Sequence, residues 1–382
     1  MRVLAVADAD SYLKWSAATL DRLPAQWDRR QAVVKSPITP SRAQTFDAAG
    51  VEVAPVSLAA LHASLVRDPP DVLLLACTGP TVQVLAGLPA CRRRRRPVLV
   101  TGLPGIAVPA SEKAIEFRRG CDLIVAHSRR ERTEFAALAT TRAPGMGVAL
   151  GRFPFLTGPA DPVSGPRRDV VFAAQAKVPR RPTDREAILL ALSELIPAGS
   201  AVVKVRALPG ERQTHHEVHG YAELWRDLAA RGAVRADSVR LVAGPMHRAL
   251  STARSLITVS STAALEAIDR GLPVVVLTDF GVNTAMINSV FEGSGCLGTL
   301  ADLRAGRAFT PDPRWLVDNY FHPAAEDDLV ERLEDLVARR RTAGLPRPSG
   351  PPPNLATARS VARLAVPSWV LRRTRPGAQR VG

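Results

Sequence analysis

Two series of short apolar runs, separated by polar or helical stretches, make up most of this chain. In the first half the runs cover residues 2–6, 51–56, 71–76, 97–102 and 122–128. In the second half they cover residues 169–174, 201–208, 239–244, 255–261 and 273–279. Apolar runs of this length, bounded by turn residues, are typical of buried strands. Residues 184–196 and 221–232 have the spacing of amphipathic helices. The alternation predicts an α/β fold with a mainly parallel sheet in each half.

A segment rich in proline and glycine, residues 157–168, separates the two series and has the composition of a linker. A chain of 382 residues is also longer than one typical core. We therefore predict an N-terminal Rossmann-like domain over residues 1–157 and a C-terminal Rossmann-like domain over residues 169–341. Ligands of open α/β sheets bind at the carboxyl ends of the strands, so we expect a cleft where these ends of the two domains face each other.

The C-terminal segment over residues 342–382 is rich in proline and arginine. Its last part is basic and contains Trp369, which is compatible with a helix lying on a membrane surface. We favour the alternative, in which the segment packs back on the first domain.

The most informative stretch covers residues 256–277 and is predicted to form a strand, a hydroxyl-rich turn, a short helix and a second buried strand. Ser260, Ser261 and Thr262 lie where the helix begins, so their hydroxyls and the free backbone N–H groups favour a phosphate. Glu266 follows Thr262 by one helical turn and would reach a sugar hydroxyl beside that phosphate. An ordinary strand–helix–strand unit, with Glu266 paired to Arg270, is the alternative.

Lys204 and Arg206 alternate along the strand at residues 201–208 and therefore project from one face near its carboxyl end. Two cations on one face suit a diphosphate, whose negative charge must be neutralised as a glycosidic bond breaks. A salt bridge to a neighbouring helix is the alternative. Lysine is rare in this chain, with only five among 51 basic residues, which favours a ligand role for Lys204.

In the first half the candidate chemistry lies on three strand ends. Asp8 and Asp10 follow the first strand, where either carboxylate could deprotonate an acceptor hydroxyl, and Ser11 follows them. Simple turn and helix-cap chemistry would explain the same residues. Gly102 and Gly105 belong to a loop that would let backbone approach a ligand. His127 ends the strand at 122–128 and is the best-placed histidine for catalysis, with a satisfied core histidine as the alternative.

The net charge of +15 raises the question of a nucleic-acid partner. No helix-turn-helix, zinc finger or aromatic-plus-basic strand accompanies the arginines, so we predict no nucleic-acid binding. An acidic small molecule or an anionic membrane surface accounts for the charge more simply. No apolar run is long enough for a transmembrane helix and the first ten residues lack a signal-peptide pattern, so we expect a cytoplasmic protein that could work at the inner face of the membrane.

The four cysteines have no CxxC spacing, which predicts free buried thiols. His215, His216 and Glu217 are adjacent in sequence and have no evident third partner, so we expect neither a metal site nor another cofactor.

Three pieces of the second half resemble bacterial glycosyltransferases of the two-Rossmann-domain (GT-B) type, especially capsule polysaccharide transferases and polyol-phosphate transferases of the CDP-glycerol type. They are DVVFAAQAKVPRR, VVKVRALPGE and LITVSSTAALEAIDRGLPVVVL. The second is similar to that family's Lys-x-His-Pro loop, although Arg206-Ala207-Leu208-Pro209 stands here where the family has His-Pro. In the first half, VADADSYLKW and residues 101–128 resemble uncharacterised glycosyltransferases of GC-rich bacteria.

The resemblance implies a metal-independent glycosyltransferase that uses a nucleotide-sugar and acts on a cell-envelope glycan or lipid-linked acceptor. Lys204, Arg206, Ser260 to Thr262 and Glu266 would hold the donor, and the first domain would present the acceptor. A polyol-phosphate transferase, a nucleotide-sugar 2-epimerase and a non-catalytic basic protein that binds anionic polymer or membrane remain as rival functions.

Overall fold

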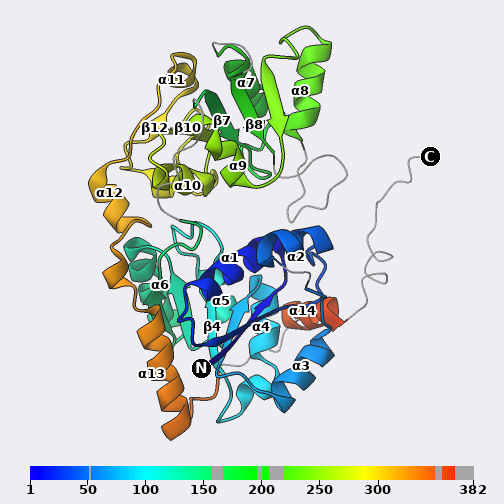
Figure 1. Ribbon diagram of the computed structural model, residues 1–382, viewed down its shortest axis with the longest axis vertical. Coiled ribbons are helices and arrows are strands. Elements are labelled where there is room, and N and C mark those ends of the chain that lie inside the picture. Colours follow the sequence, from blue (N-terminus) through cyan, green and yellow to red (C-terminus); the bar gives the residue numbers. More distant parts are fainter. Residues whose placement is uncertain (51–52, 157–166, 196–199, 206–218, 349–354, 366–382) are drawn as a thin grey trace, which may run out of the picture. The chain divides into compact units, whose positions relative to one another are not determined.

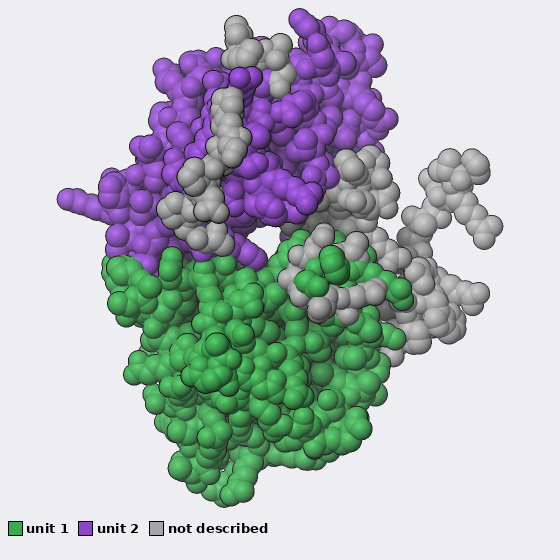
Figure 2. Space-filling view, in the orientation of Figure 1, with its two compact units in different colours: residues 1–154, 323–382 green, residues 155–322 purple. Residues whose placement is uncertain are grey.

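The computed structural model describes residues 1–50, 53–156, 167–195, 200–205, 219–348 and 355–365. The chain divides into two compact units, which are coloured separately in Figure 2. Unit 1 consists of residues 1–154 together with 323–382, and unit 2 consists of residues 155–322.

Unit 1 is built on a six-stranded parallel sheet with the strand order β2-β1-β3-β4-β5-β6. Figure 1 labels β4, one of the strands of this sheet. The strands are β1 (Arg2–Ala7), β2 (Asp28–Val33), β3 (Val72–Ala76), β4 (Val98–Gly102), β5 (Leu123–Ala126) and β6 (Gly147–Leu150). The helices are α1 (Asp10–Asp21), α2 (Arg42–Ala49), α3 (Leu58–Arg67), α4 (Gly79–Ala86), α5 (Glu112–Arg118), α6 (Arg129–Arg142), α13 (Leu329–Thr342) and α14 (Leu355–Ala365). β3, β4 and β5 are buried along their whole length, as strands covered on both faces must be.

Unit 2 repeats the same plan with a six-stranded parallel sheet of order β12-β11-β10-β7-β8-β9. Its strands are β7 (Asp169–Ala173), β8 (Ala201–Lys204), β9 (Val239–Val242), β10 (Ala253–Thr258), β11 (Val274–Leu277) and β12 (Leu297–Gly298). Its helices are α7 (Pro182–Ser193), α8 (Tyr221–Ala230), α9 (Met246–Ser251), α10 (Ala263–Asp269), α11 (Leu300–Arg304) and α12 (Pro313–Asp318).

The predicted parallel α/β sheet in each half is confirmed, because every pair of named strands is parallel. One predicted strand is wrong in its described part: of residues 51–56, only Val56 takes part in pairing, as a single bridge to Val34. The edge strand β2 takes its place, and its first three residues are exposed and charged. A strand at the edge of a sheet does not need an apolar sequence, so β2 cannot be recognised from apolar runs in the sequence.

The C-terminal part of the chain belongs to unit 1, starting at residue 323 and not at residue 342. Helix α13 buries Leu333 and Val337 and packs against β4 and β6. Helix α14 packs against α4 and α3. The sequence assigned α13 to the second domain because it directly follows that domain, and sequence order carries no information on which sheet its apolar side covers. Most of the predicted linker, residues 157–166, lies outside the described residues, as do residues 366–382.

The loop before α13 also closes the outer edge of β6. Leu150 N donates to Asp328 Oδ1 at 2.7 Å, and Asp328 N donates to the Leu150 carbonyl at 3.0 Å. Leu150 is fully buried, so its outward-facing amide would otherwise have no partner. Asp328 therefore completes an edge strand that would otherwise be open to pairing with another chain.

All four cysteines are free and buried, in agreement with the prediction. Among the described helices, none combines the length and the apolar character required to cross a bilayer.

Replacing Asp328 with alanine should destabilise unit 1, because it leaves the buried Leu150 amide without its acceptor. The expected loss in free energy of unfolding is about 1–3 kcal/mol. Chemical denaturation followed by far-UV circular dichroism measures it. Asp335→Ala on the exposed side of α13 is the matched control and should change stability little. Equal stabilities for the two variants would contradict the role of Asp328 at this edge.

Candidate functional site

In each unit the two central neighbouring strands mark the point at which the strand order reverses. In unit 2 these strands are β7 and β10: from β7 the chain proceeds to β8 and β9 on one side, and from β10 to β11 and β12 on the other. In unit 1 the corresponding strands are β1 and β3. Loops that leave such neighbours diverge, which opens a crevice at the carboxyl ends where open α/β sheets bind ligands. Most of the described candidate residues lie at or just after the carboxyl ends of strands.

The crevice of unit 2 is bridged by Gln175, which follows β7, and Ser260, which follows β10. Ser260 N donates to Gln175 Oε1 at 2.8 Å, and Gln175 Nε2 donates to Ser260 Oγ at 2.7 Å. Ser260 is 5% exposed. The two bonds fix the start of the hydroxyl-rich turn relative to the central strand β7.

The amide groups expected to stay free at this turn are used within the chain itself. Ser261 N donates to Thr258 Oγ1 at 3.1 Å, and Ala263 N donates to Ser261 Oγ at 3.2 Å. With Ser260 N held by Gln175, three predicted donors are satisfied in this way. The Thr262 side chain makes no capping bond to α10. The hydroxyl groups of Ser260, Ser261 and Thr262, more than the backbone amides, are what the turn presents to a ligand.

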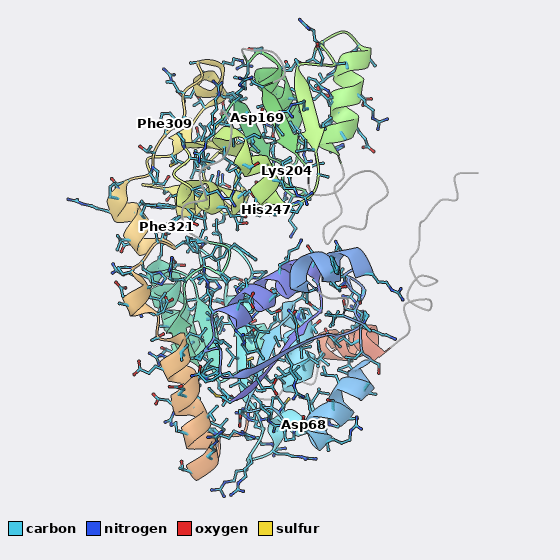
Figure 3. The ribbon with its side chains drawn as sticks, in the orientation of Figure 1. Asp68, Asp169, Lys204, His247, Phe309 and Phe321 are labelled. Carbon is cyan, nitrogen blue, oxygen red and sulfur yellow. The ribbon has the colours of Figure 1, made fainter. Side chains whose placement is uncertain are left out.

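Lys204 and Glu266 lie near the same strand ends. Lys204 is the last residue of β8, in register with Ala173 of β7, and is labelled in Figure 3. Its Nζ donates to the Val205 carbonyl at 2.9 Å. Burial raises the pKa of the Glu266 carboxyl to about 7, while the nearby positive charges of Arg270 and Lys204 oppose that rise. Lys204 and Glu266 are thus close enough to influence each other electrostatically, as a site that binds both a phosphate and a hydroxyl requires.

Glu266 is partly buried on the first turn of α10, and its side chain accepts no hydrogen bond from any described residue. A carboxylate in such surroundings usually has a partner, so its oxygens are suited to a ligand hydroxyl. Arg206, His215, His216 and Glu217 lie outside the described residues.

In unit 1, Asp8 plays a part like that of Gln175. Thr78 N donates to Asp8 Oδ1 at 3.0 Å and Thr78 Oγ1 donates to Asp8 Oδ2 at 2.6 Å, which joins the ends of β1 and β3. Asp8 is 1% exposed, and burial raises its pKa while the bonds from Thr78 lower it. Both carboxylate oxygens are therefore engaged inside the protein.

Asp10 and Ser11 begin α1 and are more accessible than Asp8. The Asp10 side chain is 21% exposed, and its Oδ2 accepts from Lys14 Nζ at 2.9 Å. Its Oδ1 is buried and has no hydrogen-bond partner among the described residues. Ser11 is partly buried at the same helix start. Of the two aspartates, Asp10 retains the carboxylate oxygen without a partner.

His127 is held at the end of β5 by two bonds that fix its protonation. Trp15 Nε1 donates to His127 Nε2 at 2.8 Å, and His127 Nδ1 lies 2.8 Å from the Gly151 carbonyl. An indole nitrogen only donates and a carbonyl only accepts, so the ring is neutral with its proton on Nδ1. Both ring nitrogens are occupied, and the imidazole is 1% exposed. In this arrangement His127 is a packed core side chain.

The same tryptophan explains Gly102, which ends β4. A Cβ at Gly102 would lie 2.4 Å from Trp15 Cζ2, so the close approach that requires glycine is to the indole. Gly105 lies in the following loop and is partly buried.

Arg118 is a charged residue near these strand ends that the sequence pattern does not single out. It is 2% exposed and donates to Thr101 Oγ1, Tyr12 Oη and the Cys77 carbonyl at 3.2, 3.0 and 3.2 Å. These bonds join the ends of β3 and β4 to α1. A single arginine near the end of a helix carries no signal for such a role, because its partners come from distant strands.

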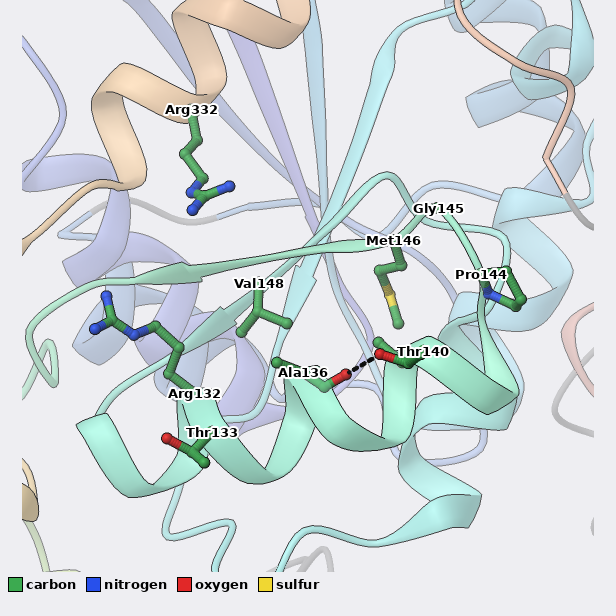
Figure 4. A pocket seen from close by; sticks show the side chains of 10 residues that line it. Arg132, Thr133, Ala136, Thr140, Pro144, Gly145, Met146, Val148 and Arg332 are labelled. Carbon is green, nitrogen blue, oxygen red and sulfur yellow. Dashed lines mark hydrogen bonds between the residues drawn. The ribbon is translucent and has the colours of Figure 1, made fainter.

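A pocket of about 710 Å³ lies elsewhere on unit 1, between α6, β6 and α13 (Figure 4). Met146 and Val148 form part of its apolar lining, and Arg132 and Arg332 border it. Arg332 is already paired with Asp328 through Nε at 2.8 Å. None of the predicted site residues lines this pocket. Within the described parts of the chain, no group of three or more His, Cys, Asp or Glu side chains could hold a metal ion.

A family model described as "Putative glycosyltransferase (DUF6716)" matches residues 3–336. No curated protein matches the chain. Among solved structures, the chain is similar to Anabaena HepE in complex with UDP and glucose, with a TM-score of 0.52, 17% identity, and coverage of 90% of this chain and 100% of that one. It is also similar to S. aureus MnaA in complex with UDP, with a TM-score of 0.52, 12% identity and 97% coverage of both chains.

A third similar structure is the UDP-GlcNAc 2-epimerase from Neisseria meningitidis bound to UDP-GlcNAc, with a TM-score of 0.51, 13% identity, and coverage of 95% of this chain and 99% of that one. At these identities the likeness concerns the fold, and it confirms the predicted GT-B class.

Glu266→Gln should stabilise the protein in a pH-dependent way. The folded-state pKa is raised from 4.5 to about 7, so ionisation of Glu266 disfavours folding by an amount that grows from pH 4.5 to 7 and is then constant. The glutamine variant carries no such penalty. Its melting temperature should match that of the wild type near pH 4 and exceed it at pH 8, as measured by calorimetry. A constant difference at all pH values would contradict the raised pKa.

Gly102→Ala should lower the stability of unit 1 by about 1–3 kcal/mol, because the new methyl group displaces the Trp15 ring. Chemical denaturation monitored by tryptophan fluorescence measures this loss. Gly220→Ala is a control, since a Cβ there would meet its nearest atom at an ordinary 3.7 Å. If Gly102→Ala left stability unchanged, the contact with Trp15 would not explain this glycine, and the predicted close approach of the backbone to a ligand would remain as its explanation.

Proposed function

Because the chain belongs to the family described as "Putative glycosyltransferase (DUF6716)", we propose that it transfers a sugar from a nucleotide-sugar to a cell-envelope glycan or a lipid-linked acceptor. The observation that carries the donor site is Glu266, a partly buried carboxylate without a hydrogen-bond donor from the described residues, beside a lysine and a hydroxyl-rich turn. The lysine and the hydroxyl groups suit the phosphates of a nucleoside diphosphate, and the carboxylate suits its sugar hydroxyls.

In the proposed donor site, three kinds of side chain bind different parts of the ligand. The Lys204 ammonium neutralises phosphate charge that develops as the sugar leaves, and Arg206 adds a second cation. The hydroxyls of Ser260, Ser261 and Thr262 donate to phosphate oxygens. The Glu266 carboxylate accepts from sugar hydroxyls of the nucleotide. The UDP complexes of HepE and MnaA, which share the fold, support a nucleoside diphosphate as the leaving part of the donor.

The acceptor unit offers a carboxylate as general base. Asp10 is the better placed of the two candidates, since Asp8 uses both oxygens to hold Thr78 and is almost completely buried. A base that removes the acceptor proton raises the nucleophilicity of the hydroxyl in an inverting transfer. In this scheme Asp8 acts indirectly, because its bonds hold the loops that follow β1 and β3 in place. Ser11 and the loop that contains Gly102 and Gly105 border the acceptor. No protein-bound metal takes part in this scheme.

A nucleotide-sugar 2-epimerase is the second candidate function. The structural likeness to the Neisseria enzyme favours it over a polyol-phosphate transferase and over a non-catalytic basic protein. Transferase and epimerase share a donor site and differ in the fate of the sugar. An epimerase releases a changed sugar without an acceptor, whereas a transferase releases the nucleotide only when an acceptor is present, apart from slow hydrolysis.

A thermal-shift panel tests the donor site directly. UDP, GDP, CDP, CMP, dTDP and ADP are compared at fixed moderate salt, with pyrophosphate as the anion control. One nucleotide should raise the melting temperature selectively, since a ligand at 100 times its Kd stabilises by about 2.7 kcal/mol. Lys204→Ala should abolish the shift, and Lys113→Ala, which removes a lysine from unit 1, should leave it intact.

Equal shifts with every anion, or none, would refute the nucleotide site and favour a basic protein that binds anionic polymer. Once the nucleotide is known, incubation with its sugar conjugates in the presence and absence of an acceptor extract separates transfer from epimerisation.

A further inference from the structure

The two units hold their central strands together with matching pairs of bonds. In unit 1 the acceptor side chain Asp8 follows β1, and it receives the amide and hydroxyl of Thr78, the second residue after β3. In unit 2 Gln175 follows β7, and it engages the amide and hydroxyl of Ser260, the second residue after β10. We call each of these pairs a strand-end clamp. Each clamp joins one side chain to the amide and the hydroxyl of a residue on the neighbouring loop. The clamping side chain is a carboxylate in unit 1 and an amide in unit 2, and the hydroxyl belongs to Thr78 in unit 1 and to Ser260 in unit 2.

In the unit 1 clamp the proton of the Thr78 hydroxyl has an acceptor inside the protein. An ionised carboxylate can only accept, so Thr78 donates both its N–H and its Oγ1–H to Asp8. Thr81 Oγ1 lies 3.2 Å from Thr78 Oγ1 and can donate to it in turn. The hydroxyl of Thr78 therefore has both a donor and an acceptor inside the protein.

In the unit 2 clamp the proton of the Ser260 hydroxyl has no acceptor among the described residues. Ser260 N is a donor, so the atom of Gln175 that faces it must be Oε1, and the amide nitrogen must then face Ser260 Oγ. Ser260 Oγ accepts from Nε2, and none of the described residues accepts its own proton. Ser260 is 95% buried, since only 5% of it is exposed. A buried hydroxyl proton without an acceptor is costly, and a ligand oxygen would remove that cost.

We propose that Gln175 sets the hydrogen-bond polarity of the donor site, so that Ser260 Oγ donates its free proton to an anionic oxygen of the nucleoside diphosphate. This inference rests on the proposed function and deepens it, because it explains why a neutral side chain holds the turn in unit 2. A carboxylate at position 175 would take the proton of Ser260, as Asp8 takes that of Thr78, and would add a negative charge beside the phosphates. Gln175 is a positioning residue, and Ser260 makes the contact.

The test is the substitution Gln175→Glu, with the affinity for UDP, GDP, CDP, dTDP and ADP measured by calorimetric titration at pH 4 and pH 8. An ionised glutamate keeps the clamp in the form seen in unit 1, so the melting temperature should stay near that of the wild type. At pH 8 the Kd should rise about tenfold or more, since a charge-assisted hydrogen bond is lost. At pH 4, below the ordinary pKa of a glutamate side chain, the protonated form accepts and donates as the amide does, so the ratio of the variant Kd to the wild-type Kd should fall toward one.

Gln83→Glu adds the same charge on α4 of unit 1 and should bind as the wild type does. Ser260→Ala removes the donating hydroxyl and should weaken binding at both pH values, which keeps the inference testable if Gln175→Glu fails to fold. Wild-type affinity in Gln175→Glu at both pH values, or in Ser260→Ala, would overturn the inference while leaving the donor site in place. If the wild-type protein binds none of these nucleotides, the proposed function fails, and this inference with it.

Discussion

The constraint on which both units depend is that main-chain amides at the ends of buried parallel strands need partners. Where two central strands send their chains in opposite directions, no neighbouring strand can supply the missing acceptor. A side chain from the adjacent loop does so in each unit, Asp8 in one and Gln175 in the other. Because these bonds tie together loops distant in sequence, they also set where the functional hydroxyls and carboxylates lie.

The sequence predicts well what is contiguous and poorly what is not. The strand, turn, helix and second strand at 256–277 appear where the pattern places them, as β10, α10 and β11. Gln175 and Thr78 give no signal in the sequence, because their importance comes from the order of strands in the sheet. β2 is missed for a related reason, since an edge strand can be polar on most of its length. To assign α13 to a unit one must know which sheet it covers, and the sequence does not contain that information.

The structure also changes how the candidate site would bind an anion. The sequence favoured both the hydroxyls and the backbone amides at a helix start, whereas the chain uses three of those amides for its own side chains. The hydroxyl protons and the positive charge of Lys204 are what the site still offers an anion. In unit 1, Arg118 and His127 are similarly committed, with their polar atoms bonded to Tyr12, Thr101, Trp15 and Gly151. Residue type alone therefore overstates how many polar groups are free to meet a substrate.

Unit 1 is assembled from two separated stretches of chain, whereas unit 2 is one continuous stretch. During synthesis the ribosome therefore releases all of unit 2 before it releases α13, which packs on the sheet of unit 1, and α14, which packs on α4 and α3. Until then the apolar side of β4 and β6 that α13 covers stays uncovered, and the outer edge of β6 lacks Asp328. Unit 1, although made first, is therefore the last unit to be completed, and the nascent protein passes through a stage at which it is most prone to aggregate.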